Sequence, residues 1–157
     1  VSCGYGKVNF LLSDRYKGDP VFPPELDKKN IRLKVPGVTS LSGGRLQLYT
    51  GLLKMPVEFP EPVDEKQAYL DFHKTGDLIN ARFYKPGDHF VPLGMQGHKK
   101  LNSYFIDRKI PRDKRSIIPI LTNSEDDIIW IYGERISDQF RITESTSKVL
   151  FIEGKAS

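Results

Sequence analysis

The balance between β-branched residues and alanine constrains the fold of this chain more than any other feature of its sequence. Isoleucine and valine together number 22 of the 157 residues, alanine numbers three, and 11 prolines interrupt the chain. β-branched side chains favour strands, alanine is the best helix former, and proline breaks helices. The sequence therefore predicts many short strands and little helix.

Seven segments have the composition or the alternation of short strands. Residues 31–35 alternate between apolar and polar side chains, and so do residues 46–48, with a less regular continuation to Leu53. Turn-forming residues, Pro36-Gly37 and Ser42-Gly43-Gly44, lie between these two segments, so we expect both strands in one antiparallel unit. The other five predicted strands are 67–72, 78–83, 117–122, 127–133 and 147–152.

Helical periodicity is confined to one region of the chain. Leu101, Tyr104, Phe105 and Arg108 recur at the spacing that lines one face of a helix, and we expect the three apolar members to be buried. This helix should end before Pro111, which can start a second short helix that runs to about Ser116. The predicted fold class is α+β: a strand-rich, mostly antiparallel sandwich or barrel-like sheet with two short helices.

The length of the chain fits one compact domain, or two small ones that share a core. The stretch 55–62 contains three prolines and reads as an extended connector. We therefore expect a strand-rich segment with its connector over residues 1–64 and a C-terminal domain over 65–157. Because the chain has no initiating methionine, we also expect it to be a piece of a longer protein.

Positive charge is concentrated in one part of the sequence. The formal net charge is +4, but residues 81–118 contain nine Lys and Arg against three Asp, which gives +6, so the remaining residues sum to −2. Such an asymmetry is expected where one face meets a polyanion, and it is also compatible with a surface that only aids solubility. The charge alone leaves both interpretations open.

The cysteine content and the lack of long apolar stretches indicate where the protein is located and which kinds of site it lacks. The single Cys3 cannot form an internal disulfide or a CxxC metal site. No apolar stretch approaches the roughly 18 residues of a membrane-spanning helix, and the first residues do not resemble a signal peptide. We expect a cytoplasmic protein with no membrane partner.

An unusual motif runs from Arg82 to Leu101. It combines an arginine, then Pro86-Gly87-Asp88, then the pattern P-x-G-M-x-G-x-K-K-L over residues 92–101. This stretch closely resembles the C-terminal region of tRNA(Ile)-lysidine synthetase. The resemblance continues through residues 105–115, a strand ending in Gly133, and residues 140–144. It is strong from about 69 to 150 and looser before that, where it rests on Val35-Pro36-Gly37 and the hairpin that follows.

The resemblance implies a tRNA-modifying ligase. That family adenylates the wobble cytidine of an isoleucine tRNA with ATP and lets free lysine attack, which gives lysidine. Its chemistry belongs to an N-terminal domain with the loop Ser-Gly-Gly-x-Asp-Ser between a strand and a helix. Here Ser42-Gly43-Gly44 is followed by Arg45-Leu46-Gln47, so we interpret it as a hairpin turn. We expect the chain alone to be inactive and to bind no cofactor, while ATP with magnesium and L-lysine belong to the parent enzyme.

The resemblance further implies that this region recognises tRNA outside the anticodon, principally at the acceptor stem. Its fold should be similar to a domain of the phenylalanyl-tRNA synthetase β chain. The implied partners are tRNA(Ile) and the N-terminal domain of the same chain, and a homodimer is left open. The residues carried over as tRNA contacts, chosen by charge and motif position, are Arg82, Lys99, Lys100, Arg108, Lys109, Arg112, Arg115 and, less directly, Arg141.

Each element of the motif also has a physical interpretation of its own. Glycines 87, 94 and 97 permit a positive φ or close backbone approach, as a loop that presents N–H groups to phosphates requires. Lysines offer mobile point charges, and arginines offer planar groups suited to bidentate phosphate contact. No catalytic residue and no metal ligand is predicted on this interpretation.

Two other hypotheses are open at the level of the sequence. A metal-dependent hydrolase could use His73, His89 and His98 with Asp71 or Asp88, although no recognised metal-binding spacing is present. Alternatively, the chain could be a structural or dimerisation module of the same enzyme, with an incidental basic face.

Overall fold

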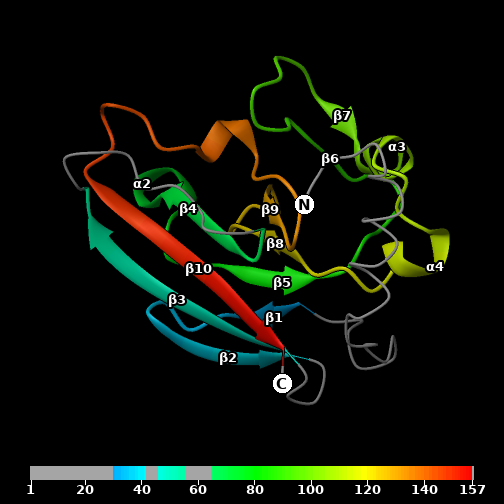
Figure 1. The fold of residues 1–157 in the computed structure, drawn as a ribbon. Coiled ribbons are helices and arrows are strands. Elements are labelled where there is room, and N and C mark those ends of the chain that lie inside the picture. The colour runs from blue at the N-terminus through cyan, green and yellow to red at the C-terminus, as the bar shows by residue number, and fades with distance from the viewer. Residues whose placement is uncertain (1–29, 42–45, 56–64, 157) are drawn as a thin grey trace.

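Two four-stranded antiparallel sheets and one two-stranded hairpin make up the fold, with short helices between them (Figure 1). The structure is a computed structural model that describes residues 30–41, 46–55 and 65–156. In chain order the elements are β1 (Ile31–Arg32), β2 (Gly37–Leu41), β3 (Leu46–Lys54), β4 (Gln67–Asp71), α2 (Phe72–Thr75), β5 (Asn80–Arg82), β6 (His89–Phe90), β7 (Lys99–Lys100), α3 (Leu101–Asp107), α4 (Arg112–Arg115), β8 (Ile120–Thr122), β9 (Ile128–Ile131), the 3₁₀ helix η3 (Asp138–Phe140) and β10 (Lys148–Ala156). The predicted α+β class is confirmed.

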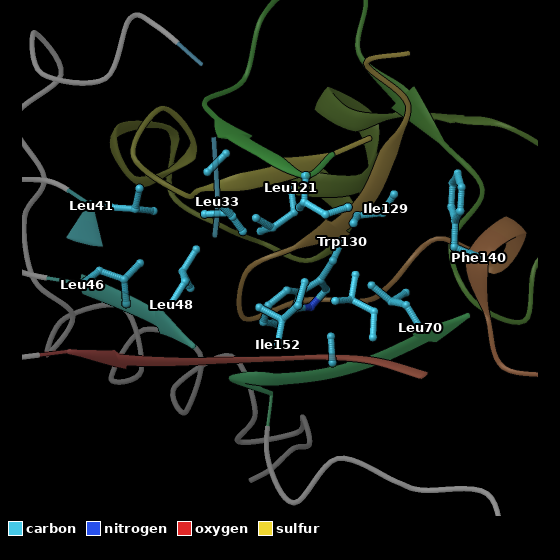
Figure 2. Close-up of a cluster of buried hydrophobic side chains, with 14 residues drawn as sticks. Leu33, Leu41, Leu46, Leu48, Leu70, Leu121, Ile129, Trp130, Phe140 and Ile152 are labelled. Carbon is cyan, nitrogen blue, oxygen red and sulfur yellow. The ribbon is translucent and has the colours of Figure 1, made fainter. Parts of the chain in front are cut away.

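The main hydrophobic core lies between the two larger sheets. One sheet has the strand order β2-β3-β10-β4 and the other has the order β1-β5-β8-β9. Figure 2 shows side chains of the first sheet, such as Leu48 and Ile152, pointing toward Leu121 and Ile129 of the second. In β3 buried and partly buried residues alternate, as a strand with one covered face requires. Two sheets with one apolar face each are thus stabilised by burying those faces against each other.

The predicted pairing of segments 31–35 and 46–53 in one antiparallel unit is wrong. Strand β1 pairs with β5, whereas β3 pairs with β2 and β10. The β1–β5 ladder ends at Arg32, and the chain enters the other sheet as β2 directly after Pro36, which has no amide donor for a ladder. β2 is a strand that was not predicted from the sequence, and its first residue, Gly37, belongs to the predicted Pro36-Gly37 turn.

The hairpin interpretation of the Ser42-Gly43-Gly44 motif agrees with its flanks. Residues 42–45 lie outside the described part of the chain, but β2 and β3 on either side pair antiparallel, with Leu41 opposite Leu46. A strand therefore follows the motif, where a nucleotide-binding loop of the expected kind would need a helix.

A short helix, α2, follows β4 where the sequence suggested only a strand. The Asp71 carboxylate accepts hydrogen bonds from the backbone N–H groups of His73 and Lys74, at 2.9 and 3.4 Å. It also accepts a hydrogen bond from the Thr146 hydroxyl at 2.7 Å. Asp71 is an N-cap, and capping by an acidic side chain ends the strand and starts the helix. The described residues hold three α-helices, one more than expected.

A second, smaller core lies beneath α3. The predicted helical face is confirmed, because Leu101, Tyr104 and Phe105 are all buried. They pack with Phe90 of the hairpin and with isoleucines of β8, β9 and the loops nearby. This core fixes α3 and the β6–β7 hairpin to the end of the β1-β5-β8-β9 sheet.

Both larger sheets combine strands from before and after residue 64. β1 from the first predicted segment pairs with β5 from the second, and β3 pairs with β10. The connector at 56–64 itself lies outside the described residues, and the division at residue 64 stays a prediction. Among the helices of the described residues, none has the length and apolar character needed to cross a membrane.

Candidate nucleic-acid interface

Most of the predicted contact residues gather at one end of the molecule. Figure 1 shows β7, α3 and α4 together on the side away from β2, β3 and β10. The chain passes through β7, α3 and α4 without leaving this end, so the basic residues of 99–115 share one region of the surface. Arg82 and Arg141 are the two members of the predicted set that lie outside this run.

Arg82 differs from the expectation, because its guanidinium is buried. The side chain is only 6% exposed, and two of its nitrogens donate to the two carboxylate oxygens of Asp88, each at 2.9 Å. Its Nε donates to Asp126 at 2.9 Å. Burial alone would lower the pKa of Arg82, but the hydrogen bonds that Arg82 donates to Asp88 and Asp126, together with their negative charges, outweigh it, and the pKa is raised. We therefore correct its assignment from an RNA contact to a residue that holds the neighbouring loop.

The Pro86-Gly87-Asp88 motif forms a turn that holds the N-terminus of α3 in place. Asp88 is buried, accepts from the backbone N–H of Lys85 at 3.0 Å, and its own carbonyl accepts from the N–H of Leu101 at 2.8 Å. Gly87 has a φ of +95°, which non-glycine residues rarely adopt. The motif thus fixes the first turn of α3 through the Arg82–Asp88 pair.

The predicted need for glycine, through a positive φ or a close backbone approach, is confirmed at two of the three positions 87, 94 and 97. Gly94 has a φ of +87°, as Gly87 has a positive φ, and the N–H of Gly94 donates to the Asp138 carboxylate at 3.1 Å. Gly97 has neither a positive φ nor an atom close to where a Cβ would lie. The conformation of Gly97 therefore gives no reason for a glycine at that position.

The two lysines of β7 point in different directions. Lys99 forms an ion pair with Asp107 at the end of α3, which leaves its side chain 26% exposed. Lys100 is exposed and occupies the N-cap position of α3, without a side-chain cap. Lys100 is thus available to a ligand, whereas Lys99 would have to exchange or share Asp107.

Arg108 is positioned by a buried carboxylate. Its Nε donates to the Oε1 atom of Glu134 at 3.0 Å, and the Glu134 side chain is fully buried. The Tyr104 hydroxyl donates to the same oxygen at 3.1 Å. Burial, followed by the charge of Glu134, raises the pKa of Tyr104 well above its usual value, so this phenol stays protonated. Arg108 is thus held at the surface in a fixed direction.

The last three residues of the run surround the α3–α4 turn. Lys109 is exposed and has a φ of +59°, which lets the chain reverse between the helices. Arg112 is exposed at the start of α4. Arg115 is half-buried, and its Nε donates to the carbonyl of Ile110 at 2.9 Å. Two exposed cations and one anchored guanidinium therefore lie within one turn of chain.

Arg141 lies outside this run, next to the β6–β7 loop. Its Nε is 3.7 Å from the Asp138 carboxylate that also binds Gly94. Arg135, which was not predicted, donates to the carbonyl of Leu93 in the same loop at 3.2 Å. Sequence reasoning also missed Asp126 and Glu134, because carboxylates 44 and 26 residues from their arginine partners leave no local pattern.

The metal hypothesis finds no support in the geometry of the described residues. His89 and His98 do lie together, with ring centroids 4.9 Å apart, but Asp88 is bound to Arg82 and Asp71 caps α2. Within 30–41, 46–55 and 65–156, no group of three His, Cys, Asp or Glu residues could hold a metal ion. The Ser42-Gly43-Gly44 segment likewise does not fit a nucleotide, since Leu46 and Gln47 stand where aspartate and serine are required.

The architecture and the motif positions can be compared with known proteins. A family described as "TilS substrate C-terminal domain" matches residues 79–152. The tRNA(Ile)-lysidine synthase of Caldanaerobacter subterraneus subsp. tengcongensis is 39% identical over 122 residues, which cover 77% of this chain and 26% of that protein. The synthase of Parabacteroides distasonis is 36% identical over 149 residues, which cover 94% of this chain and 33% of that protein. The chain thus spans a third or less of the length of these relatives.

Solved structures confirm the fold. A structure described as "Crystal structure of TILS C-terminal domain" has a TM-score of 0.67 at 22% identity and covers 82% of this chain and 98% of that one. An N-terminal fragment of the phenylalanyl-tRNA synthetase β-subunit from Pyrococcus horikoshii has a TM-score of 0.50 at 22% identity and covers 56% of this chain and 27% of that one. The fold, the matched residues and the relatives agree, and the chain carries the C-terminal domain of the tRNA(Ile)-lysidine synthase family.

Proposed function

We propose that this domain binds tRNA(Ile), principally at the acceptor stem, for a synthase whose N-terminal domain converts the wobble cytidine to lysidine. That conversion consumes ATP, with magnesium, and L-lysine, and this chain supplies recognition and no catalytic group. The enzyme would meet its tRNA in the cytoplasm. The observation that carries the proposal is the cationic surface from β7 to α4, built on a rigid helix with a buried face.

The geometry of this surface suits an RNA duplex. In A-form RNA the base edges lie deep in a narrow major groove, so recognition depends on shape, phosphates and 2′-hydroxyl groups. Lys100, Lys109 and Arg112 are exposed cations, and Arg108 and Arg115 are held in fixed directions by Glu134 and by the Ile110 carbonyl. A guanidinium that is already oriented loses less side-chain entropy when it binds a phosphate.

Double substitutions in the intact synthase test the proposal. Lys99→Ala with Lys100→Ala, and separately Arg112→Ala with Arg115→Ala, should weaken tRNA(Ile) binding and reduce the slope of log affinity against log salt by about one per lost phosphate contact. Filter binding at several salt concentrations measures both quantities.

A matched control uses lysines remote from this end. Lys54 on β3 and Lys74 on α2 are also exposed, so Lys54→Ala with Lys74→Ala removes the same charge and should leave binding unchanged. Unchanged tRNA affinity in both test variants would leave only the structural or dimerisation role. Equal losses in the test and control variants would mean that net charge, and not this surface, attracts the RNA.

A further inference from the structure

A polar cavity of about 290 Å³ opens beside the Pro86–Asp88 loop. It lies between the β6–β7 hairpin, the turn before β9, and η3, and none of the predicted tRNA contacts lines it. Small-molecule pockets measure roughly 300–1,000 Å³, so this one has room for a single planar group and not for a duplex.

The floor and one wall of the cavity suit the face of an aromatic ring. Phe90 and Ile128 are buried and give an apolar floor. The exposed rings of His89 and His98 meet edge to face, with centroids 4.9 Å apart, and both line the cavity. Proteins hold unstacked bases by stacking them on aromatic side chains, including histidine.

The rim of the cavity is rich in hydrogen-bond acceptors. In the described part of the chain, the Asp127 carboxylate has one side-chain partner, the Asn123 amide nitrogen at 3.5 Å, and the Gln139 side chain has none. Three aspartates line the cavity: Asp88 and Asp126 are both paired with Arg82, and Asp126 is also paired with the lining lysine, Lys85, at 3.0 Å. Among the described residues this leaves Asp127 as the lining carboxylate without a cationic partner. This lining disfavours a phosphate and favours a neutral group that donates hydrogen bonds.

A cation stands next to the mouth of the cavity. In the β6–β7 ladder His89 is directly opposite Lys100. Directly opposite side chains lie on the same face of a sheet, with Cβ atoms about 4.5–5.5 Å apart. Lys100 is therefore on the same face of the hairpin as His89, from where its long side chain can reach the phosphate of a nucleotide whose base is inside.

We propose that this cavity takes one unpaired base with an exocyclic amino group from the single-stranded 3′ end of the bound tRNA. The inference rests on the proposed function. Every tRNA ends in unpaired C, C and A next to its acceptor stem, and each of these bases has an exocyclic amino group. The imidazole of His98 stacks on the base, the nearly perpendicular imidazole of His89 contacts the base edge, and Asp127 and Gln139 accept from the amino group, as carboxylates accept from cytosine N4.

Three forms of tRNA(Ile) test this site in the intact synthase: one that ends in CCA, one that lacks these three nucleotides, and one that ends in UUU. Uracil keeps the phosphates and the ring but has no exocyclic amino group. We expect the truncated and the UUU forms to bind the wild-type protein about 10-fold more weakly than the CCA form. His98→Ala and Gln139→Ala should weaken binding of the CCA form alone, whereas Glu125→Ala, which removes a neighbouring exposed carboxylate outside the cavity, should change nothing.

The outcomes separate this inference from the function on which it rests. Equal affinity of the wild-type protein for the CCA and truncated forms would overturn the site while the tRNA-binding function stands. The same holds if the UUU form binds as tightly as the CCA form, or if His98→Ala weakens the CCA and truncated forms alike. A synthase that retains none of the three tRNAs at low salt would overturn the function and the site together.

Discussion

The core between the two large sheets and the core beneath α3 are built in different ways. Within the described residues, the first buries 14 side chains from strands far apart in the sequence, and the second buries nine. Among the described residues, the second is bordered by two ion pairs that each have a buried partner, Arg82 with Asp88 and Arg108 with Glu134. The larger core supplies stability through apolar area, whereas the smaller one uses charged partners to fix the direction of surface cations.

Glu134 joins the two regions. Its carboxylate accepts from Tyr104 of α3 and from Arg108, the C-cap residue of that helix. Its backbone carbonyl accepts from the indole nitrogen of Trp130, a residue of the main core, at 3.1 Å. One residue thus couples the packing of the sheets to the orientation of the basic end. Substitutions in the main core should therefore lower the stability of the fold alone. Substitutions around Glu134 should lower both the stability and the affinity for RNA.

The largest effect on stability is expected from Trp130→Ala. Trp130 is fully buried in the main core, and its removal leaves a cavity that the two sheets can fill only in part. The free energy of unfolding should fall by about 3–5 kcal/mol, as measured by urea denaturation. Val38→Ala on the exposed side of β2 is the control and should change it by less than about 0.5 kcal/mol. A loss of less than about 1 kcal/mol for Trp130→Ala would contradict the conclusion that the main core supplies stability through buried apolar area.

An intermediate effect is expected from Glu134→Gln. The substitution keeps the shape of the side chain but removes the charge that Arg108 binds, so stability should fall by about 1–3 kcal/mol. Affinity for tRNA(Ile) should fall as well, because Arg108 loses its fixed direction. Glu144→Gln, at an exposed carboxylate, serves as the matched control in denaturation and filter-binding experiments. Lower stability with unchanged affinity would show that Glu134 only supports the fold.

The smallest effect is expected from Asp126 at acid pH. Burial would raise the pKa of Asp126, but hydrogen bonds from Arg82 and Lys85 outweigh it and lower the pKa below 3.8. A carboxylate with a lowered pKa stabilises the fold at pH values above its unfolded pKa, and this contribution is lost as pH falls through the folded value. The stability difference between wild type and Asp126→Asn should thus be present at pH 7 and shrink below about pH 4. Urea denaturation of both proteins at pH 7 and below about pH 4 measures this difference. A stability difference that grows in acid would contradict the lowered pKa of Asp126.

Much of the candidate interface could be read from the sequence because its parts are local. Leu101, Tyr104 and Phe105 mark the buried face of α3 by their spacing, and the lysines and arginines beside them follow in order along the chain. The proline and glycine punctuation also marks most strand ends. Local pattern therefore predicted the elements, the class and the basic run.

The strand partners and the roles of individual charges could not be read in this way. The sequence determined that the chain forms short strands and a basic helical end, since β-branched residues, prolines and periodic apolar side chains act within a few residues. Only the tertiary structure decided that β1 and β3 belong to different sheets, that Arg82 is buried against Asp88 and Asp126, and that Glu134 holds Arg108. Sheet order and ion pairing depend on which distant segments meet when the core closes, and burial then decides whether an arginine faces a phosphate or an aspartate.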